Sequence, residues 1–173
     1  MVMVMGGHPG PMGRQGQIAV IGSGTCEEGS EPWRLAEEVG RRLAAAGVTV
    51  VCGGMTGVME AVAGGAAQML GPVIGILPGS EIDDANPHCT HIVATGIGHG
   101  RNLAVVASGE ATIAIGGEWG TLSEIGFARA IGRPVVALRS WTPKGEGAMQ
   151  SAPGIVVAST PEEAVAAALE AIA

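Results

Sequence analysis

The sequence predicts a doubly wound α/β fold, in which helices cover both faces of one mainly parallel β-sheet. Short continuous apolar runs alternate along the chain with segments of helical periodicity. The runs are apolar at consecutive positions, as expected for strands that are buried on both faces of a sheet. Glycines gather where several of these runs end, which is the edge of such a sheet where its loops meet.

The first half of the chain sets up the alternation. QIAVIG (17–22) predicts a buried strand, and the apolar spacing of 31–46 predicts a helix that ends before a glycine. VTVVC (48–52) predicts a second strand, followed after GGMTG by a helix over 58–69. PVIGILP (72–78) predicts a third strand.

The pattern continues after a polar loop. HIVAT (91–95) predicts a short strand, and GIGHG then opens a helix over 101–108. ATIAI (111–115) predicts a strand that leads through GGEWG into a helix over 121–132. PVVAL (134–138) predicts another strand, so that strand and helix keep alternating.

A last strand and helix complete the pattern. GIVVA (154–158) predicts the strand, and 160–173 the helix. Thr160, Pro161 and Glu163 suit the N-cap, the first and the third position of that helix. We find no internal repeat and expect one domain, a Rossmann-like nucleotide-binding domain over 17–173, preceded by a flexible leader over 1–16.

Composition limits the function classes. The chain has 173 residues, 47% of them hydrophobic, which suits one domain with a real core. Its net charge of −7 argues against nucleic acid as a partner, but a helix N-terminus can still bind an anion. Three cysteines without a C-x-x-C pair argue against disulfides and structural zinc. We therefore expect a cytoplasmic protein with no membrane segment.

Four glycine-rich loops lie at or beside the predicted carboxyl edge of the sheet. A single glycine turn would be weak evidence, but four together predict a cradle for a phosphate or a nucleotide. The loops match neither a complete G-x-G-x-x-G nor a G-x-x-x-x-G-K-[ST] phosphate loop. The candidate binding residues are Gly22, Ser23, Gly24, Gly53, Gly54, Gly57, Arg101, Asn102, Gly116, Gly117, Gly120 and Thr121.

Glu124 lies about one helical turn beyond Thr121, near the same predicted mouth. The alternative is a capping-box role, because Thr121 and Glu124 form a T-x-x-E pattern. Glu118 is ambiguous, since a carboxylate inside an anion loop would repel phosphate unless it points outward. Trp119 suits either stacking on a ligand ring or packing against a neighbouring subunit or helix.

Four segments carry a resemblance to a known superfamily. GGMTGVMEAVAGGA, ILPG with ANP, TGIGHGRN and GGEWGTLSE resemble the superfamily of Lonely Guy (LOG) phosphoribohydrolases and molybdenum cofactor carrier proteins. Its members are often labelled lysine decarboxylases, and the fold also resembles that of DNA-processing Smf/DprA proteins. The similarity covers about residues 17–141.

The resemblance implies roles for particular residues. The catalytic Glu and Arg of LOG enzymes fall on Glu124 and Arg101, and the phosphate-binding loop falls on 116–121. In such an enzyme these residues would cleave the N-glycosidic bond of a nucleoside 5′-monophosphate. Three departures favour the carrier branch: Ile115 replaces a proline, Arg101-Asn102 replaces an Arg-Lys pair, and GFARAIG replaces an aromatic-rich helix.

Two function classes therefore remain open. One is a binding or carrier protein for a phosphorylated heterocycle, either a nucleotide or a molybdopterin-type cofactor. The other is a LOG-type phosphoribohydrolase. We expect no required cofactor, although the resemblance allows a bound nucleotide or molybdenum cofactor, and we expect a homodimer or homotetramer.

Two other activities are disfavoured by the residues themselves. Pyridoxal phosphate chemistry needs a lysine for the Schiff base, and Lys144 is the single lysine of the chain, far in sequence from any glycine loop. We therefore reject lysine decarboxylation. The segment HCTH (88–91) has the wrong spacing for two histidines on one helix face, so we expect no metal site.

Overall fold

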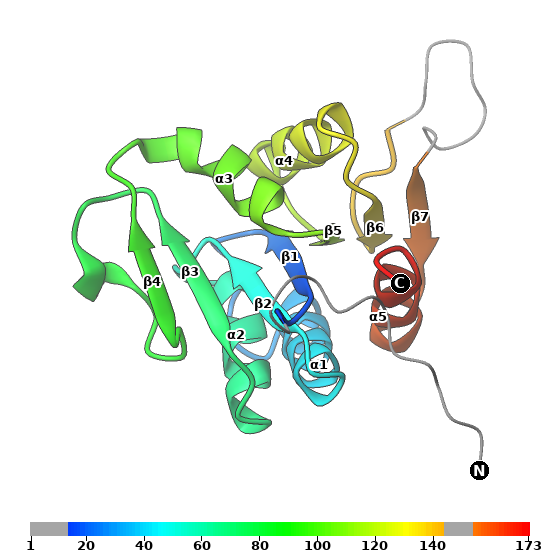
Figure 1. Ribbon diagram of the computed structural model, residues 1–173, viewed down its shortest axis with the longest axis horizontal. Helices are drawn as coiled ribbons and strands as arrows, with labels where there is room; N and C mark the ends of the chain where they lie inside the picture. The colour runs from blue at the N-terminus through cyan, green and yellow to red at the C-terminus, as the bar shows by residue number, and fades with distance from the viewer. Residues whose placement is uncertain (1–13, 144–153) are drawn as a thin grey trace.

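The computed structural model describes residues 14–143 and 154–173. Most of the predicted leader and Lys144 lie outside the described residues. In the described part the chain forms a seven-stranded parallel sheet with helices on both faces, as predicted (Figure 1). The strands are β1 (Gln17–Gly22), β2 (Thr49–Cys52), β3 (Val73–Leu77), β4 (His91–Ala94), β5 (Ala111–Ile115), β6 (Val135–Leu138) and β7 (Ile155–Ala158).

The helices divide into two layers. One layer holds α1 (Glu31–Ala45), α2 (Val58–Gln68) and α5 (Pro161–Glu170), and the other holds α3 (Arg101–Ser108) and α4 (Trp119–Ala130) (Figure 1). Short 3₁₀ turns at Ile82–Asp84 and Gly98–Gly100 were not predicted.

The sheet order β4-β3-β2-β1-β5-β6-β7 places β1 at its centre. From β1 the chain builds outward to β4 on one side, then returns to place β5 on the other side of β1. Every strand pair is parallel, and the crossovers from β1 to β2, β2 to β3, β4 to β5 and β5 to β6 each contain an α-helix. The loops after β1 and β5 consequently leave the sheet toward opposite helix layers.

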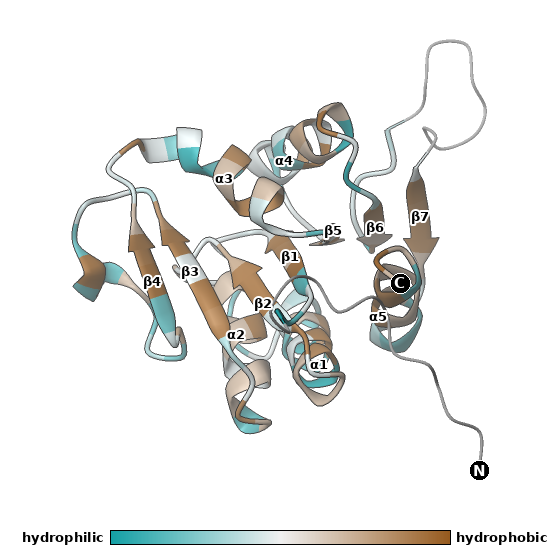
Figure 2. Ribbon diagram, viewed as in Figure 1, coloured by the Kyte–Doolittle hydropathy of each residue, from teal (hydrophilic) through white to brown (hydrophobic). Residues whose placement is uncertain are grey.

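The sheet separates two hydrophobic cores. The larger core packs β-strand residues against α1, α2 and α5, and the smaller one packs the other face against Val105 of α3 and Ile125 of α4. Figure 2 shows the strands as mostly hydrophobic along their length. The inner strands are largely buried, as expected for a sheet covered on both faces, whereas much of the edge strands β4 and β7 is exposed. Aliphatic side chains and alanines fill both cores.

Helices α1 and α2 approach each other closely at two glycines. A Cβ on Gly40 would collide with the backbone carbonyl of Val62, and a Cβ on Gly65 would collide with that of Glu37. The neighbouring atoms are backbone, so they cannot rotate away. These glycines therefore set the distance between the two helices.

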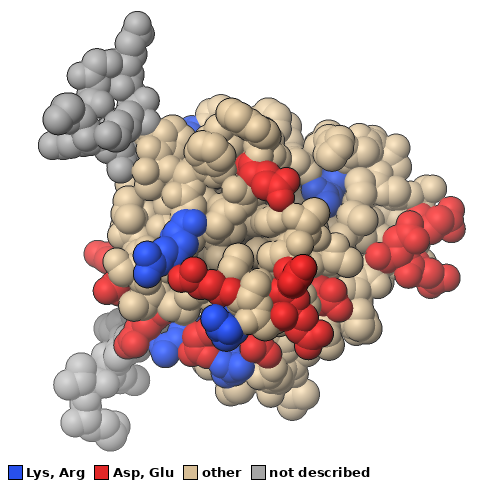
Figure 3. Space-filling view, turned by 180° about the vertical axis from the view of Figure 1, so that it is seen from behind, with Lys and Arg blue, Asp and Glu red and all other residues tan. Residues whose placement is uncertain are grey.

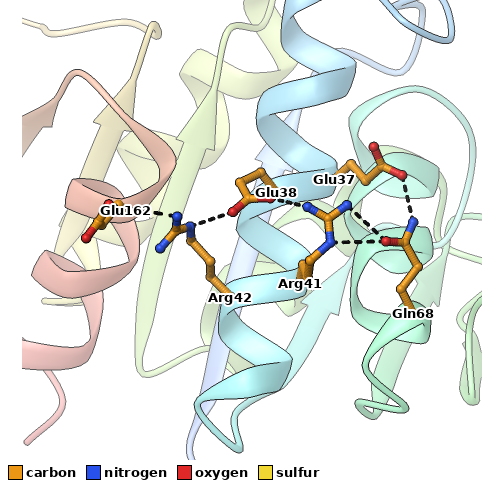
Figure 4. A network of polar contacts seen from close by, with 6 residues as sticks. All are labelled: Glu37, Glu38, Arg41, Arg42, Gln68 and Glu162. Atoms are coloured by element: carbon orange, nitrogen blue, oxygen red, sulfur yellow. Dashed lines mark hydrogen bonds and ion pairs between the residues drawn. The ribbon is translucent and has the colours of Figure 1, made fainter.

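Polar side chains join the outer surfaces of the same layer (Figure 4). Arg41 donates to Glu38 and, at 2.9 and 3.1 Å, to Gln68 of α2. Arg42 donates to Glu38 at 2.7 Å and lies 3.8 Å from Glu162 of α5. On the face shown in Figure 3, basic side chains lie among acidic ones and form no continuous basic surface in the part of the chain described.

One predicted helix start agrees with the structure and another does not. The Thr160 cap is confirmed, because its hydroxyl accepts from the Glu163 N–H at 3.2 Å. The predicted start of α4 at Thr121 is wrong, because the helix begins at Trp119 with Glu118 as its N-cap. Gly120 in the first helical turn conceals this start, since glycine is a poor helix former.

No helix in residues 14–143 and 154–173 has the length and apolar character that a membrane crossing requires.

Candidate functional site

A cleft of about 280 Å³ opens at the carboxyl ends of β1 and β5. These two neighbouring strands lie where the strand order reverses, so their following loops diverge and leave a crevice between them. We call it the β1/β5 cleft. It is lined by Val20, Ile21, Gly22, Ser23, Gly24, Gly53, Met59, His99, Arg101, Asn102, Glu118, Gly120, Thr121 and Glu124.

Arg101 is a buried cation in this cleft, with 8% of its surface exposed. It is the first residue of α3, and its guanidinium donates to the Asn102 side chain and, at 3.4 Å, to the Gly53 carbonyl. Its Nε is buried and has no hydrogen-bond partner among the described residues. Burial lowers the pKa of Arg101, and the Glu124 carboxylate opposes this shift. Arginine side chains nevertheless stay charged in proteins at neutral pH.

Glu124 enters the same cleft from α4 and is only 7% exposed. Burial raises its pKa to about 7, although the nearby Arg101 cation favours the ionised form. The two groups form no ion pair within 4 Å in the described structure. A carboxyl group that is partly protonated at neutral pH can both accept and donate a proton there.

The capping-box interpretation of Glu124 is wrong. Thr121 is the third residue of α4 rather than its N-cap, so the T-x-x-E pattern lies inside the helix. Both side chains are buried and line the β1/β5 cleft. The pattern therefore places two polar groups on the inner face of α4.

Two glycines make the cleft possible. A Cβ on Gly22 would lie 2.5 Å from the Ile115 carbonyl oxygen, so this residue lets β1 end against β5. A Cβ on Gly53 would lie 2.6 Å from Nη2 of Arg101 and 2.5 Å from the Met59 sulfur. Gly53 thus leaves the space that the guanidinium occupies.

Other predicted glycines lie outside the cleft. Gly54 packs against the backbone of Gly75, and Gly57 packs against the loop at Gly24, both with positive φ. Neither glycine lines the cleft. Both instead allow the close backbone contacts that hold the loop after β2 in place.

The loop after β5 is shared between two hollows. Gly120 and Thr121 line the β1/β5 cleft, whereas Gly116 and Gly117 line a separate groove beside it. Gly117 has φ +106°, and a Cβ there would collide with Thr121. In the predicted phosphate loop, therefore, Gly116 and Gly117 do not line the cleft that contains Arg101, whereas Gly120 and Thr121 do.

Glu118 ties the two sides of the cleft together. Its Oε1 accepts hydrogen bonds from the hydroxyls of Ser23, at 3.1 Å, and Thr25, at 2.9 Å. The carboxylate therefore lines the cleft and does not point away from it. Its other oxygen has no bond to the loop after β1, so it remains an acceptor for a ligand hydroxyl or amino group.

Met59 and His99 also line the cleft but were not predicted. Met59 lies 3.9 Å from Nη2 of Arg101, and nothing distinguishes it in sequence from other apolar residues of α2. His99 is two residues before Arg101, in the GIGHG loop, and that proximity was a usable signal. Among the described residues, no three His, Cys, Asp or Glu side chains cluster as a metal site would need.

Comparisons with known proteins give a consistent family. The sequence profile of the SLOG cluster4 family matches residues 15–165. An uncharacterized protein of Archaeoglobus fulgidus is 41% identical over 149 residues, which cover 86% of this chain and 91% of that protein.

Solved structures agree with this match. The molybdenum cofactor binding protein of Rippkaea orientalis has a TM-score of 0.82 and 30% identity, covering 92% of this chain and 99% of that one. The molybdenum cofactor carrier protein of Chlamydomonas reinhardtii has a TM-score of 0.78 and 27% identity, covering 91% and 98%. DprA of Streptococcus pneumoniae shares the fold alone, at 19% identity and a TM-score of 0.65 over 88% of this chain and 61% of that one.

Proposed function

Because the chain belongs to the SLOG cluster4 family, we propose that it binds and carries a phosphorylated heterocycle in the β1/β5 cleft. The ligand is a nucleotide or a molybdopterin-type cofactor, both of which join a phosphate to a planar ring. The membership also confirms the resemblance drawn from GGMTG and GGEWG.

The buried Arg101 is the observation that carries this proposal. An arginine with 8% exposure and an unpartnered Nε keeps a positive charge in a place shielded from water. Such a cation costs free energy unless an anion joins it. The cleft beside it is bordered by glycine backbone, by Thr121 and by the carboxyl groups of Glu118 and Glu124, so a phosphate is favoured next to Arg101 and disfavoured next to these carboxyl groups.

The residues present fit a molybdopterin-type cofactor as well as a nucleotide. Arg101 and Asn102 would hold the phosphate, and the free oxygen of Glu118 would accept from a ring amino group or a hydroxyl. When bound, the group would carry metal-centred redox chemistry for delivery elsewhere. This chain's own residues bind, orient and shield it from water.

The experiment is calorimetric titration of the protein with AMP, and comparison with Arg101→Gln. We expect Arg101→Gln to weaken AMP binding at least about tenfold, because a charge-assisted contact to phosphate is lost. Arg14→Gln is the matched control, since Arg14 lies at the opposite end of the sheet and pairs with Glu110 at 3.2 Å. Equal AMP affinity in the protein and in both variants would exclude the β1/β5 cleft as the phosphate site.

The second candidate is the phosphoribohydrolase, and Glu124 is the observation that favours it. A carboxyl group with a pKa near 7 beside a buried arginine suits general acid–base catalysis at an N-glycosidic bond. Incubation with AMP should then release adenine, and Glu124→Gln should abolish that release while leaving AMP binding within about threefold. Tight binding without release of adenine favours the carrier.

The remaining expectations stay proposals. We propose a homo-oligomer in the cytoplasm without a nucleic-acid partner; the net charge of −7 supports the last point. The case against a lysine decarboxylase depends on Lys144, whose surroundings lie outside the described residues.

A further inference from the structure

A second hollow lies on the far side of the loop after β5. It has a volume of about 540 Å³, within the range of small-molecule sites, and opens where β5 and β6 end. We call it the β5/β6 groove. It is lined by Gly116, Gly117, Leu122 and the segment 139–143.

Trp141 lines this groove, and the ring of Trp119 lies beside the ring of Trp141; we call the pair the Trp119–Trp141 platform. The rings of Trp119 and Trp141 have centroids 5.6 Å apart and are tilted by 30°. The Trp141 ring is fixed in place, because its Nε1–H donates to the Gly117 carbonyl at 3.2 Å. Trp119 is 76% exposed, so most of its ring surface is open to a further stacking partner.

Among the described residues that line the groove, Arg139 is the one charged side chain. It adopts φ +52°, which is unusual for a residue other than glycine and indicates a local constraint. Its ion pair with Glu31 is loose, since Nε lies 3.8 Å from the Glu31 carboxylate and both side chains are about two-thirds exposed. Ser140 holds the adjacent backbone by donating to the Gly116 carbonyl at 2.5 Å.

From these contacts we propose that the β5/β6 groove is a second binding site, for a planar heterocycle that carries an anionic group. The ring stacks on the Trp119–Trp141 platform and the anion meets Arg139. A small ligand fits better than a second copy of the chain, because a volume of about 540 Å³ lies within the range of small-molecule sites whereas protein interfaces are broad. Arg139 is a cation, and no acidic side chain of the described part of the chain lines the groove, so the groove favours an anionic ligand.

The site is independent of Arg101, so its test separates it from the function proposed above. AMP and flavin mononucleotide are titrated into Trp33→Phe, with binding followed by tryptophan fluorescence and, in parallel, by calorimetry. In this variant the remaining tryptophan emission reports on Trp119 and Trp141. We expect binding that quenches this emission and that keeps its affinity when Arg101→Gln is added. Loss of this quenching in Arg101→Gln would instead assign the signal to the β1/β5 cleft and overturn the proposal.

Two substitutions then locate the ligand. Trp119→Ala should weaken AMP binding at the groove at least about fivefold through lost stacking, while leaving ribose 5-phosphate unaffected. Arg139→Asn should weaken the binding of both AMP and ribose 5-phosphate, because it removes the charge. Asparagine tolerates the positive φ of this position. Absence of quenching by AMP and by flavin mononucleotide at millimolar concentration would overturn the proposal. A change in sedimentation on Trp119→Ala with unchanged AMP affinity would overturn it too, because the platform would then bind protein.

Discussion

At the scale of single residues, the cleft depends on a glycine, because a side chain at this position would take up the space of the arginine. Gly53 leaves the space that the Arg101 guanidinium fills, beside the Met59 sulfur. Gly53→Ala should displace the flexible ends of these side chains, so we expect AMP affinity to fall several-fold while the unfolding free energy changes by less than about 1 kcal/mol. Calorimetry and urea denaturation measure the two quantities. A large loss of stability with unchanged affinity would contradict this role for Gly53.

Glu124 should make stability depend on pH in an unusual direction. Its pKa of about 7 in the folded protein exceeds the ordinary glutamate pKa of 4.5, so the folded state binds the extra proton between these two pH values. Its contribution is therefore fully present below about pH 4.5 and is lost as the pH rises through 7. Urea denaturation at pH 5 and pH 8 should show Glu124→Gln gaining up to about 3 kcal/mol relative to the parent at pH 8.

The comparison between the parent and Glu124→Gln cancels the titration of the other groups. At pH 5 the glutamine resembles the protonated acid, and the two proteins should then unfold at similar urea concentrations. An identical difference at both pH values would mean that Glu124 titrates normally.

At the scale of elements, the contact between α1 and α2 is the most sensitive to added volume. A methyl group on Gly65 would meet the backbone of Glu37, so Gly65→Ala should destabilise the protein by about 2 kcal/mol or more. Gly126→Ala is the matched control, since Gly126 lies in α4 with open space around it and alanine favours helix by about 1 kcal/mol. Urea denaturation should move the two variants in opposite directions.

At the scale of the whole molecule, exposed apolar side chains in the α3/α4 layer support the expected homo-oligomer. Leu103 of α3 and Phe127 of α4 are each 41% exposed, and the two helices pack together. Leu103→Asp should therefore reduce the sedimentation coefficient by weakening an interface between copies. Leu70→Asp is the control, because Leu70 is 95% exposed in the turn after α2. If both variants and the parent sedimented equally, Leu103 and α3 would not contribute to an interface between copies.

The sequence predicted the fold well because each buried strand is a continuous apolar run, as in 111–115 and 135–138. It also predicted that Arg101 and Glu124 lie near one mouth, although they lie on different helices, and both line the β1/β5 cleft. It could not assign Gly116 and Gly117 to the other hollow, because the side of a loop that a glycine faces depends on its φ and on tertiary contacts. The order of the strands likewise depends on packing of whole layers.

The hydrogen bonds from Ser23 and Thr25 to Glu118 have one further consequence. They fasten the loop after β1 to the loop after β5, so the width of the entrance is set before any ligand arrives. The two loops are then already joined when a molecule enters, which lowers the entropic cost of association. Capture should follow a simple second-order rate law without a slow closing phase.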